Sequence, residues 1–171
     1  DTSWKNKLIW GDNKYVMASL LQGDSSIGLE PLAGKIDLIY IDPPFATGQA
    51  FSYHVRVGDE EWVKEASIIE ETAYRDTWGR GLESYLQMMY ERLRLMREIL
   101  AETGSIFVHV DWSISSYVRT MLSEVFGDHN CRNEIAWWYY NKLQGNVGRF
   151  PANHDTIFWF SKGPTFTFNK L

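Results

Sequence analysis

The stretch Asp37–Phe45, DLIYIDPPF, is a short apolar run that ends abruptly in an acid and two prolines. Leu38 to Ile41 is rich in β-branched and aromatic residues, which is typical of a strand buried on both faces of a parallel sheet. Asp42 then stands at the carboxyl end of the predicted strand, the edge at which open α/β sheets bind ligands. The stretch therefore predicts an α/β fold with a ligand site at Asp42.

The prolines after Asp42 make the turn stiff and rich in acceptors. Pro43 and Pro44 end the strand and restrict the backbone of the residue before each of them. Neither carries an N–H, so carbonyl groups stay free to accept hydrogen bonds, and Phe45 adds a flat aromatic face. Such a turn suits a planar ligand with an amino group, for example a nucleobase. Asp-Pro-Pro also begins ordinary turns, so a purely structural role stays open.

Length and composition indicate a single globular domain, residues 1–171. The chain is 44% hydrophobic, with eight Trp and nine Phe, unlike a disordered protein. No apolar run approaches the roughly 20 residues that span a bilayer, and no secretory signal is present, so we expect a cytoplasmic protein without a membrane partner. The single cysteine, Cys131, excludes an internal disulfide and a cysteine-cluster zinc site. The spacing of His54, His129 and His154 indicates no metal site.

Hydrophobic periodicity predicts the remaining elements. Upstream of Asp37, Lys7–Trp10 is expected to be a short strand, and Gly11-Asp12-Asn13 leads into an apolar helical pattern that begins at Val16, so this region forms a βαβ unit. Downstream, the predicted elements are a short helix around Glu60–Ala66, a helix over Leu82–Ala101 that ends at Thr103-Gly104, a strand over Ser105–Val110, a helix from Ile114 to Val125, and a hairpin of Asn133–Tyr140 with Asp155–Ser161.

Three further polar residues have two interpretations each. Asp12 stands where it would cap a helix, and a second role for it is implied only by the family resemblance described below. His109 lies inside a predicted strand, where a core histidine with satisfied hydrogen bonds is the ordinary interpretation and a ligand-binding histidine is the alternative. Asp111 closes that strand, so it either caps the next helix or faces the ligand crevice.

DPPF after an apolar strand, with GDN one helix upstream, resembles the motifs of amino-group DNA methyltransferases, which methylate N6 of adenine or N4 of cytosine. The resemblance implies a doubly wound, Rossmann-like methyltransferase sheet that is mostly parallel with a C-terminal antiparallel hairpin. It also implies S-adenosyl-L-methionine as cofactor and DNA as partner. By this resemblance Asp42, Pro43, Pro44 and Phe45 are catalytic, and Asp12 and Asp42 bind the cofactor.

The implied reaction is a direct transfer of methyl to N6 of an adenine flipped out of the duplex. Hydrogen bonds from the amino group to the Asp42 carboxylate and the Pro43 carbonyl would favour a pyramidal nitrogen and stabilise its developing positive charge. Phe45 would stack on the base. In this family Asp rather than Ser before Pro-Pro favours adenine over cytosine, so N4-cytosine methylation is the less favoured alternative.

The family's glycine-rich Phe-x-Gly-x-Gly turn has no good match in this sequence. The nearest segment, Trp78-Gly79-Arg80-Gly81, does not follow a predicted strand. In the permuted β class the catalytic half comes first and the glycine-rich motif lies near the C-terminus. The resemblance covers nearly all of the chain, and the subgroup that the sequence resembles most is the modification subunits of type III restriction systems and related adenine-specific enzymes. It therefore implies an incomplete sheet, a catalytic half without the target-recognition region and the glycine-rich motif.

Several alternatives stay open at this point. The chain is either a catalytic portion or a non-catalytic fragment, such as one subunit of a split methyltransferase. Its candidate protein partners are the missing half, a restriction subunit, and a second copy of the chain that pairs through an open sheet edge. The net charge of −5 is unusual for a DNA-binding protein, so the basic surface is local or the DNA-reading part lies elsewhere. Lys142 and Arg149 either contact DNA phosphate or are solvated. A doubly wound domain for another nucleotide would require all the motif matches to arise by chance.

Overall fold

The computed structural model describes residues 6–44, 53–57, 60–64, 81–140, 148 and 150–169, and it divides the chain into two compact units. The first unit holds residues 1–43 and 90–171, and the second holds residues 44–89. The elements in chain order are α1 (Asn13–Gln22), the short 3-10 helix η1 (Ser25–Ile27), β1 (Ile36–Ile41), β2 (Tyr53–Val57), β3 (Glu60–Lys64), α3 (Leu82–Ile99), β4 (Leu100–Asp111), α4 (Ser115–Phe126), η2 (Asp128–Asn130), β5 (Cys131–Trp138) and β6 (His154–Ser161).

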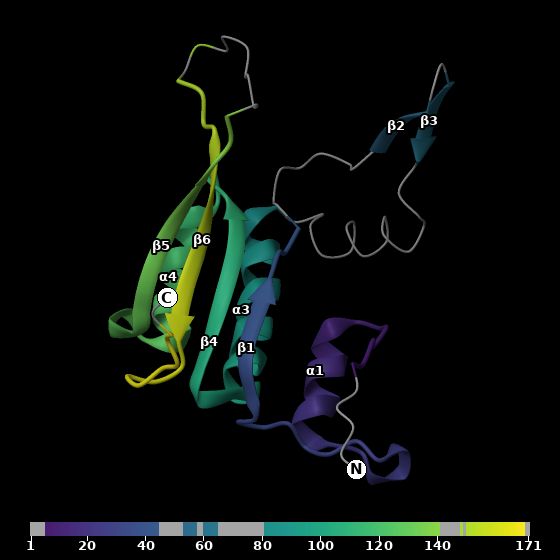
Figure 1. Cartoon of the computed structure of the whole chain (residues 1–171), viewed down its shortest axis with the longest axis vertical. Helices are drawn as coiled ribbons and strands as arrows, with labels where there is room; N and C mark the ends of the chain where they lie inside the picture. The colour runs from purple at the N-terminus through teal and green to yellow at the C-terminus, as the bar shows by residue number, and fades with distance from the viewer. Residues whose placement is uncertain are drawn as a thin grey trace. The chain divides into compact units, whose positions relative to one another are not determined.

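The first unit is built on a four-stranded sheet of order β1-β4-β6-β5 (Figure 1). β1 pairs with β4 in parallel, whereas β4 with β6 and β6 with β5 are antiparallel pairs. The α/β fold class and the C-terminal hairpin are confirmed. The described sheet is mixed rather than mostly parallel, because the hairpin contributes two of its four strands and inserts β6 beside β4.

The hydrophobic core lies between the sheet and the helices of one face. Figure 1 shows α4 and the 90–99 part of α3 behind the sheet. Alternate residues of β4 point to this face, so Ile106, Val108 and Val110 are fully buried, as are Leu122 of α4 and Phe158 of β6. This packing, which the apolar periodicity of the two helices allows, holds the strands in a register that decides what the other face presents.

The other face of the sheet is partly covered by aromatic residues of the C-terminal segment. The Trp159 ring stacks on Phe107 of β4, with ring centroids 5.5 Å apart. Phe166 and Phe168 contact the same indole, one edge-on and one stacked, each with ring centroids 5.5 Å away. Nearer to β1 the face is open, since Leu38 and Tyr40 are 60% and 56% exposed.

Gly104 lies inside β4 and not at a helix end, which corrects the prediction that Thr103-Gly104 terminates the preceding helix. α3 ends at Ile99 and β4 follows at once, with a register irregularity against β1 between Ile36 and Leu38. A Cβ at Gly104 would lie 2.9 Å from the Ile36 carbonyl oxygen, so only glycine allows this approach. Gly104 therefore helps to seat β1 against β4.

Two other predicted elements are wrong. Lys7–Trp10 is not a strand in the structure, where Leu8 and Trp10 are 100% and 86% exposed, because no neighbouring strand in the described ranges offers backbone hydrogen bonds to it. Within the helix expected around Glu60–Ala66, residues 60–64 instead form β3, which pairs antiparallel with β2, and residues 65–66 lie outside the described residues. Tyr53–Val57 alternates apolar and polar residues and Gly58-Asp59 is a turn signal, so the sequence here fits a hairpin better than a weakly periodic helix.

No helix within the described ranges is long and apolar enough to cross a bilayer.

We predict that Gly104→Ala destabilises the protein by about 1–3 kcal/mol, because the new methyl group forces β1 away from β4. This loss exceeds the roughly 0.4–1 kcal/mol that alanine contributes by restricting the unfolded chain. Urea denaturation measures the difference. The control is Thr103→Ala, which introduces the same residue at an exposed neighbouring position. Its free energy of unfolding should stay within about 0.5 kcal/mol of wild type. Equal stability of the two variants would contradict the close approach.

Candidate active site

One edge of the sheet collects polar side chains from all four strands. The carboxyl ends of β1 and β4 meet there because these strands are parallel. Since β6 runs antiparallel to β4, its first residues lie at the same edge, and the last residues of β5 pair with them. Asp42, His109, Asp155 and Tyr139 therefore come from four different segments of the chain to one place.

Asp42 follows β1 directly, as predicted, and its side chain is 59% exposed. Pro43 is half-buried and Pro44 is exposed. The proposed stacking residue, Phe45, lies outside the described residues. The strand and its abrupt end at Asp42 agree with the prediction, whereas the expected burial of the strand on both faces is wrong, since Leu38 and Tyr40 are exposed.

His109 is the basic side chain closest to this acid in the described part of the chain. Its Nδ1 lies 3.8 Å from Asp42 Oδ1 and 3.3 Å from the Tyr40 hydroxyl oxygen. Its Nε2 lies 3.2 Å from Asp155 Oδ2. The imidazole is 15% exposed and bridges the acid of β1 to the acid of β6. The interpretation as a core histidine with satisfied hydrogen bonds is therefore correct for burial, but it misses the contact with Asp42.

Asp155 is the buried acid of the cluster, with a side chain that is 4% exposed. The Tyr139 hydroxyl donates a hydrogen bond to Asp155 Oδ2 at 2.5 Å. That hydrogen bond, with burial and the negative charges of Asp155 and Asp42, raises the pKa of Tyr139 to about 12. A phenol and an imidazole thus surround the carboxylate, as a buried charge requires.

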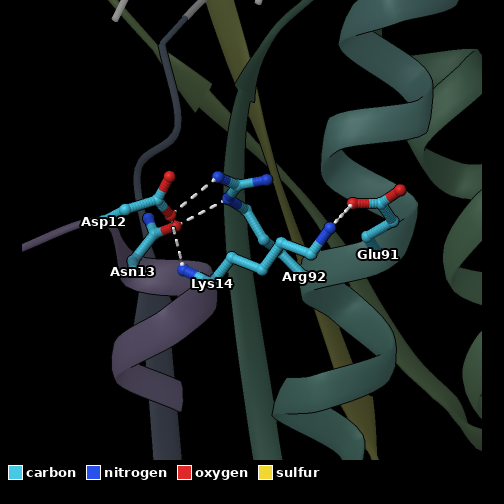
Figure 2. Close-up of polar contacts among 5 residues, drawn as sticks. All are labelled: Asp12, Asn13, Lys14, Glu91 and Arg92. Carbon is cyan, nitrogen blue, oxygen red and sulfur yellow. Dashed lines mark hydrogen bonds and ion pairs between the residues drawn. The ribbon is translucent and has the colours of Figure 1, made fainter. Parts of the chain in front are cut away.

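Asp12 lies at the start of α1, where it caps the helix by accepting a hydrogen bond from the Lys14 backbone N–H at 2.8 Å (Figure 2). Arg92 of α3 lies beside it, with Nη2 3.2 Å from Asp12 Oδ1 and Nε donating to Asn13 Oδ1 at 2.6 Å. Lys14 Nζ forms an ion pair with Glu91 at 2.5 Å. The capping role is therefore confirmed, and the GDN turn is attached to α3 by side-chain contacts.

Asp111 does not cap α4. Its carboxylate accepts a hydrogen bond from the Ser113 N–H at 2.8 Å, and α4 begins at Ser115 without a side-chain cap. Lys142 and Arg149 lie outside the described residues. Among the residues that the structure does describe, no three His, Cys, Asp or Glu side chains gather as a metal site.

The sequence-based assignment missed Asp155 and Tyr139 as members of the site. One local signal was present: Asp155 opens the apolar strand of the hairpin, where an acid at a buried position needs a partner. The partner itself depends on β6 lying beside β4, which no local pattern encodes. The same strand order brings Tyr139, just beyond β5, onto the same carboxylate.

Comparison with known proteins places this geometry in a family. Residues 36–171 match the family model of the N6/N4 DNA methylases. The type II methyltransferase M.EcaI of Enterobacter cloacae is 31% identical over 165 residues, which are 96% of this chain and 31% of that protein. The EcoP15I Mod subunit of a type III restriction-modification enzyme from Escherichia coli is 29% identical, with 88% and 25% of the two chains covered. The chain thus spans less than a third of these relatives.

Solved structures agree on the fold. A DNA modification methylase from Thermus thermophilus, complexed with S-adenosyl-L-methionine, aligns with a TM-score of 0.55 at 13% identity and covers 94% of this chain and 54% of that one. M1.HpyAVI, also complexed with that cofactor, gives a TM-score of 0.53 at 16% identity, with 94% and 57% covered. Given the family match over residues 36–171 and the acid-proline turn at the edge of a Rossmann-like sheet, the chain belongs to the N6/N4 DNA methylase family.

Proposed function

We propose that this chain is the catalytic portion of a DNA methyltransferase that transfers a methyl group from S-adenosyl-L-methionine to N6 of a flipped adenine. The observation that carries the proposal is the exposed Asp42 carboxylate at the carboxyl end of β1, followed by two prolines, within the family match. This is the edge at which α/β sheets bind ligands. Asp in front of Pro-Pro supports adenine over cytosine.

The proposed chemistry requires activation of a weak nucleophile. The amino nitrogen of adenine delocalises its lone pair into the ring, so it attacks only when this delocalisation is reduced. Asp42 and the Pro43 carbonyl would accept the two amino hydrogens and stabilise the positive charge that develops on nitrogen. Phe45 would stack on the flipped base and orient it. S-adenosyl-L-methionine, when bound, supplies the electrophilic methyl group.

The residues present fit part of the cofactor. Asp12 is proposed to accept hydrogen bonds from the adenosine portion. Its Oδ1 already accepts from the Lys14 N–H and from Arg92, while its side chain remains 50% exposed. Arg92 and the N-terminus of α1 place positive charge beside this carboxylate. Asp42 would complete the contacts that this chain makes to the cofactor near the methyl group.

The proposed partners follow from the proposed methyltransferase function. DNA would be the substrate, and a restriction subunit is the proposed protein partner, since a type III Mod subunit is among the relatives. A second copy of the chain is a further candidate, because β1 is the edge strand of the described sheet. A protein with these partners would work in the cytoplasm.

A non-catalytic role as one subunit of a split methyltransferase is the second candidate. N4-cytosine methylation is the alternative within the family. Cofactor binding distinguishes the catalytic from the non-catalytic function, and the identity of the methylated nucleoside distinguishes adenine from cytosine methylation.

We predict that Asp42→Asn lowers kcat for methyl transfer by about 10²–10³-fold, the usual effect of removing one group that stabilises transition-state charge. The protein as its gene encodes it is assayed with tritiated cofactor on unmodified and hemimethylated duplex. Asp37→Asn, an exposed acid at the opposite end of β1, is the matched control and should retain full activity. Wild-type kcat in Asp42→Asn would refute the role of this carboxylate.

The methylated DNA is then digested and its nucleosides are separated by mass. We expect N6-methyladenine. Exclusive formation of N4-methylcytosine would keep the methyltransferase function and reverse the base assignment.

We predict that S-adenosyl-L-methionine binds and that Asp12→Ser weakens binding by roughly 10–100-fold, the effect of one hydrogen bond to a charged group. Calorimetry measures the affinity, with S-adenosylhomocysteine as a second ligand. Serine is itself a good helix cap, so this variant removes the carboxylate while retaining the start of α1. Asp24→Ser, the same change at the cap of η1, is the control. Unchanged affinity in Asp12→Ser would contradict the assignment of Asp12 to the cofactor.

A further inference from the structure

Two of the acids at the sheet edge are in opposite environments, and one imidazole connects them. Asp42 is 59% exposed, while Asp155 is 4% exposed. His109 presents Nδ1 to Asp42 and Nε2 to Asp155. The ring comes from β4, which pairs with β1 on one side and with β6 on the other. The three groups thus form a line across three adjacent strands.

The buried end of this line determines that Nε2 of the ring carries a proton. Asp155 accepts the Tyr139 hydroxyl hydrogen bond at 2.5 Å, and its charge helps to raise the pKa of Tyr139 to about 12, so the phenol remains a donor. An ionised carboxylate only accepts hydrogen bonds. His109 Nε2, 3.2 Å from the same oxygen, must therefore donate to it. Asp155 thus fixes both the ring plane of His109 and the protonation of Nε2.

The other end of the line faces the acid at the end of β1. Nδ1 lies 3.3 Å from the Tyr40 hydroxyl, which can donate or accept, and 3.8 Å from Asp42 Oδ1. The second distance exceeds a hydrogen bond, and contacts of this kind commonly tighten when substrate binds. The prolines after Asp42 restrain its backbone but not the rotation of its carboxylate. In the described part of the chain, His109 is the basic side chain within 4 Å of that carboxylate.

We propose that Asp155 and His109 are positioning residues for Asp42. Asp155 holds the imidazole through the Nε2–H group, and the imidazole, when Nδ1 also carries a proton, attracts the Asp42 carboxylate and holds it in the orientation that receives the amino group of the base. This inference rests on the proposed function. It assigns a role to a buried acid and a histidine that lie outside the Asp-Pro-Pro turn.

The two natural amide replacements of histidine separate a positioning role from a purely structural one. His109→Gln places an amide nitrogen near the position of Nε2, so it keeps a donor for Asp155 and loses the group that faces Asp42. His109→Asn retains a polar group near the position of Nδ1 but cannot reach Asp155. If His109 only satisfied the buried carboxylate, His109→Gln would behave as wild type.

We expect His109→Gln to lower kcat roughly 10²-fold, the scale on which misplacement of a reacting group costs rate. KM for DNA and for S-adenosyl-L-methionine should stay within about threefold of wild type, because substrate binding is not what is lost. Asp155→Asn and His109→Asn should lower kcat as well. The matched controls are His129→Gln and Asp128→Asn, two exposed residues of η2, and both should retain wild-type kcat. Wild-type kcat in His109→Gln would overturn the proposal.

A second measurement does not depend on activity. Long-range proton–nitrogen NMR of the histidine rings in the ¹⁵N-labelled protein should show His109 protonated at Nε2 in wild type. Asp155→Asn should shift the Nε2 resonance, and Asp42→Asn should shift the Nδ1 resonance. A wild-type protein that transfers no methyl group would refute the proposed function alone. A His109 ring whose nitrogen resonances are unchanged in both Asp variants would refute the positioning role, whatever the activity.

Discussion

The register of β4 between β1 and β6 is the constraint on which the rest of the structure depends. Val108 and Val110 point into the helix-covered core and are fully buried, so His109 between them must point to the opposite face. A slip of one residue would place the imidazole in the core and two valines at the ligand edge. Burial of the apolar face of β4 thus also determines that His109 lies on the opposite face of the sheet.

This constraint explains how side chains from separate segments of the chain meet at one edge of the sheet. The parallel pairing with β1 brings Asp42 level with His109, and the antiparallel pairing with β6 brings Asp155 to the same ring. The buried acid is surrounded by donors and orders its neighbours, whereas the exposed acid remains accessible to a ligand. Two carboxylates on one sheet edge thus lie in different environments.

Local patterns predicted the elements whose stability is local or strongly amphipathic. Helices α3 and α4 and the hairpin strands lie close to where periodicity placed them, since each presents one apolar stripe to the core. The failures have physical causes. Lys7–Trp10 has the composition of a strand but no partner in the described sheet. Gly104 has the sequence context of a helix terminator, but it lies inside β4. Its missing side chain lets the Ile36 carbonyl oxygen come close, since a Cβ at this position would lie 2.9 Å from that oxygen.

The amino-acid sequence by itself determined that an apolar strand ends at Asp42, that prolines stiffen the turn after it, and that Asp12 caps a helix upstream, because each depends on residues adjacent in the chain. Only the tertiary structure decided that His109 faces Asp42 and that Asp155, 46 residues further along, holds the imidazole from behind. The reason is strand order. β6 lies between β4 and β5, and that insertion follows from how whole strands bury their apolar faces rather than from any short stretch of residues.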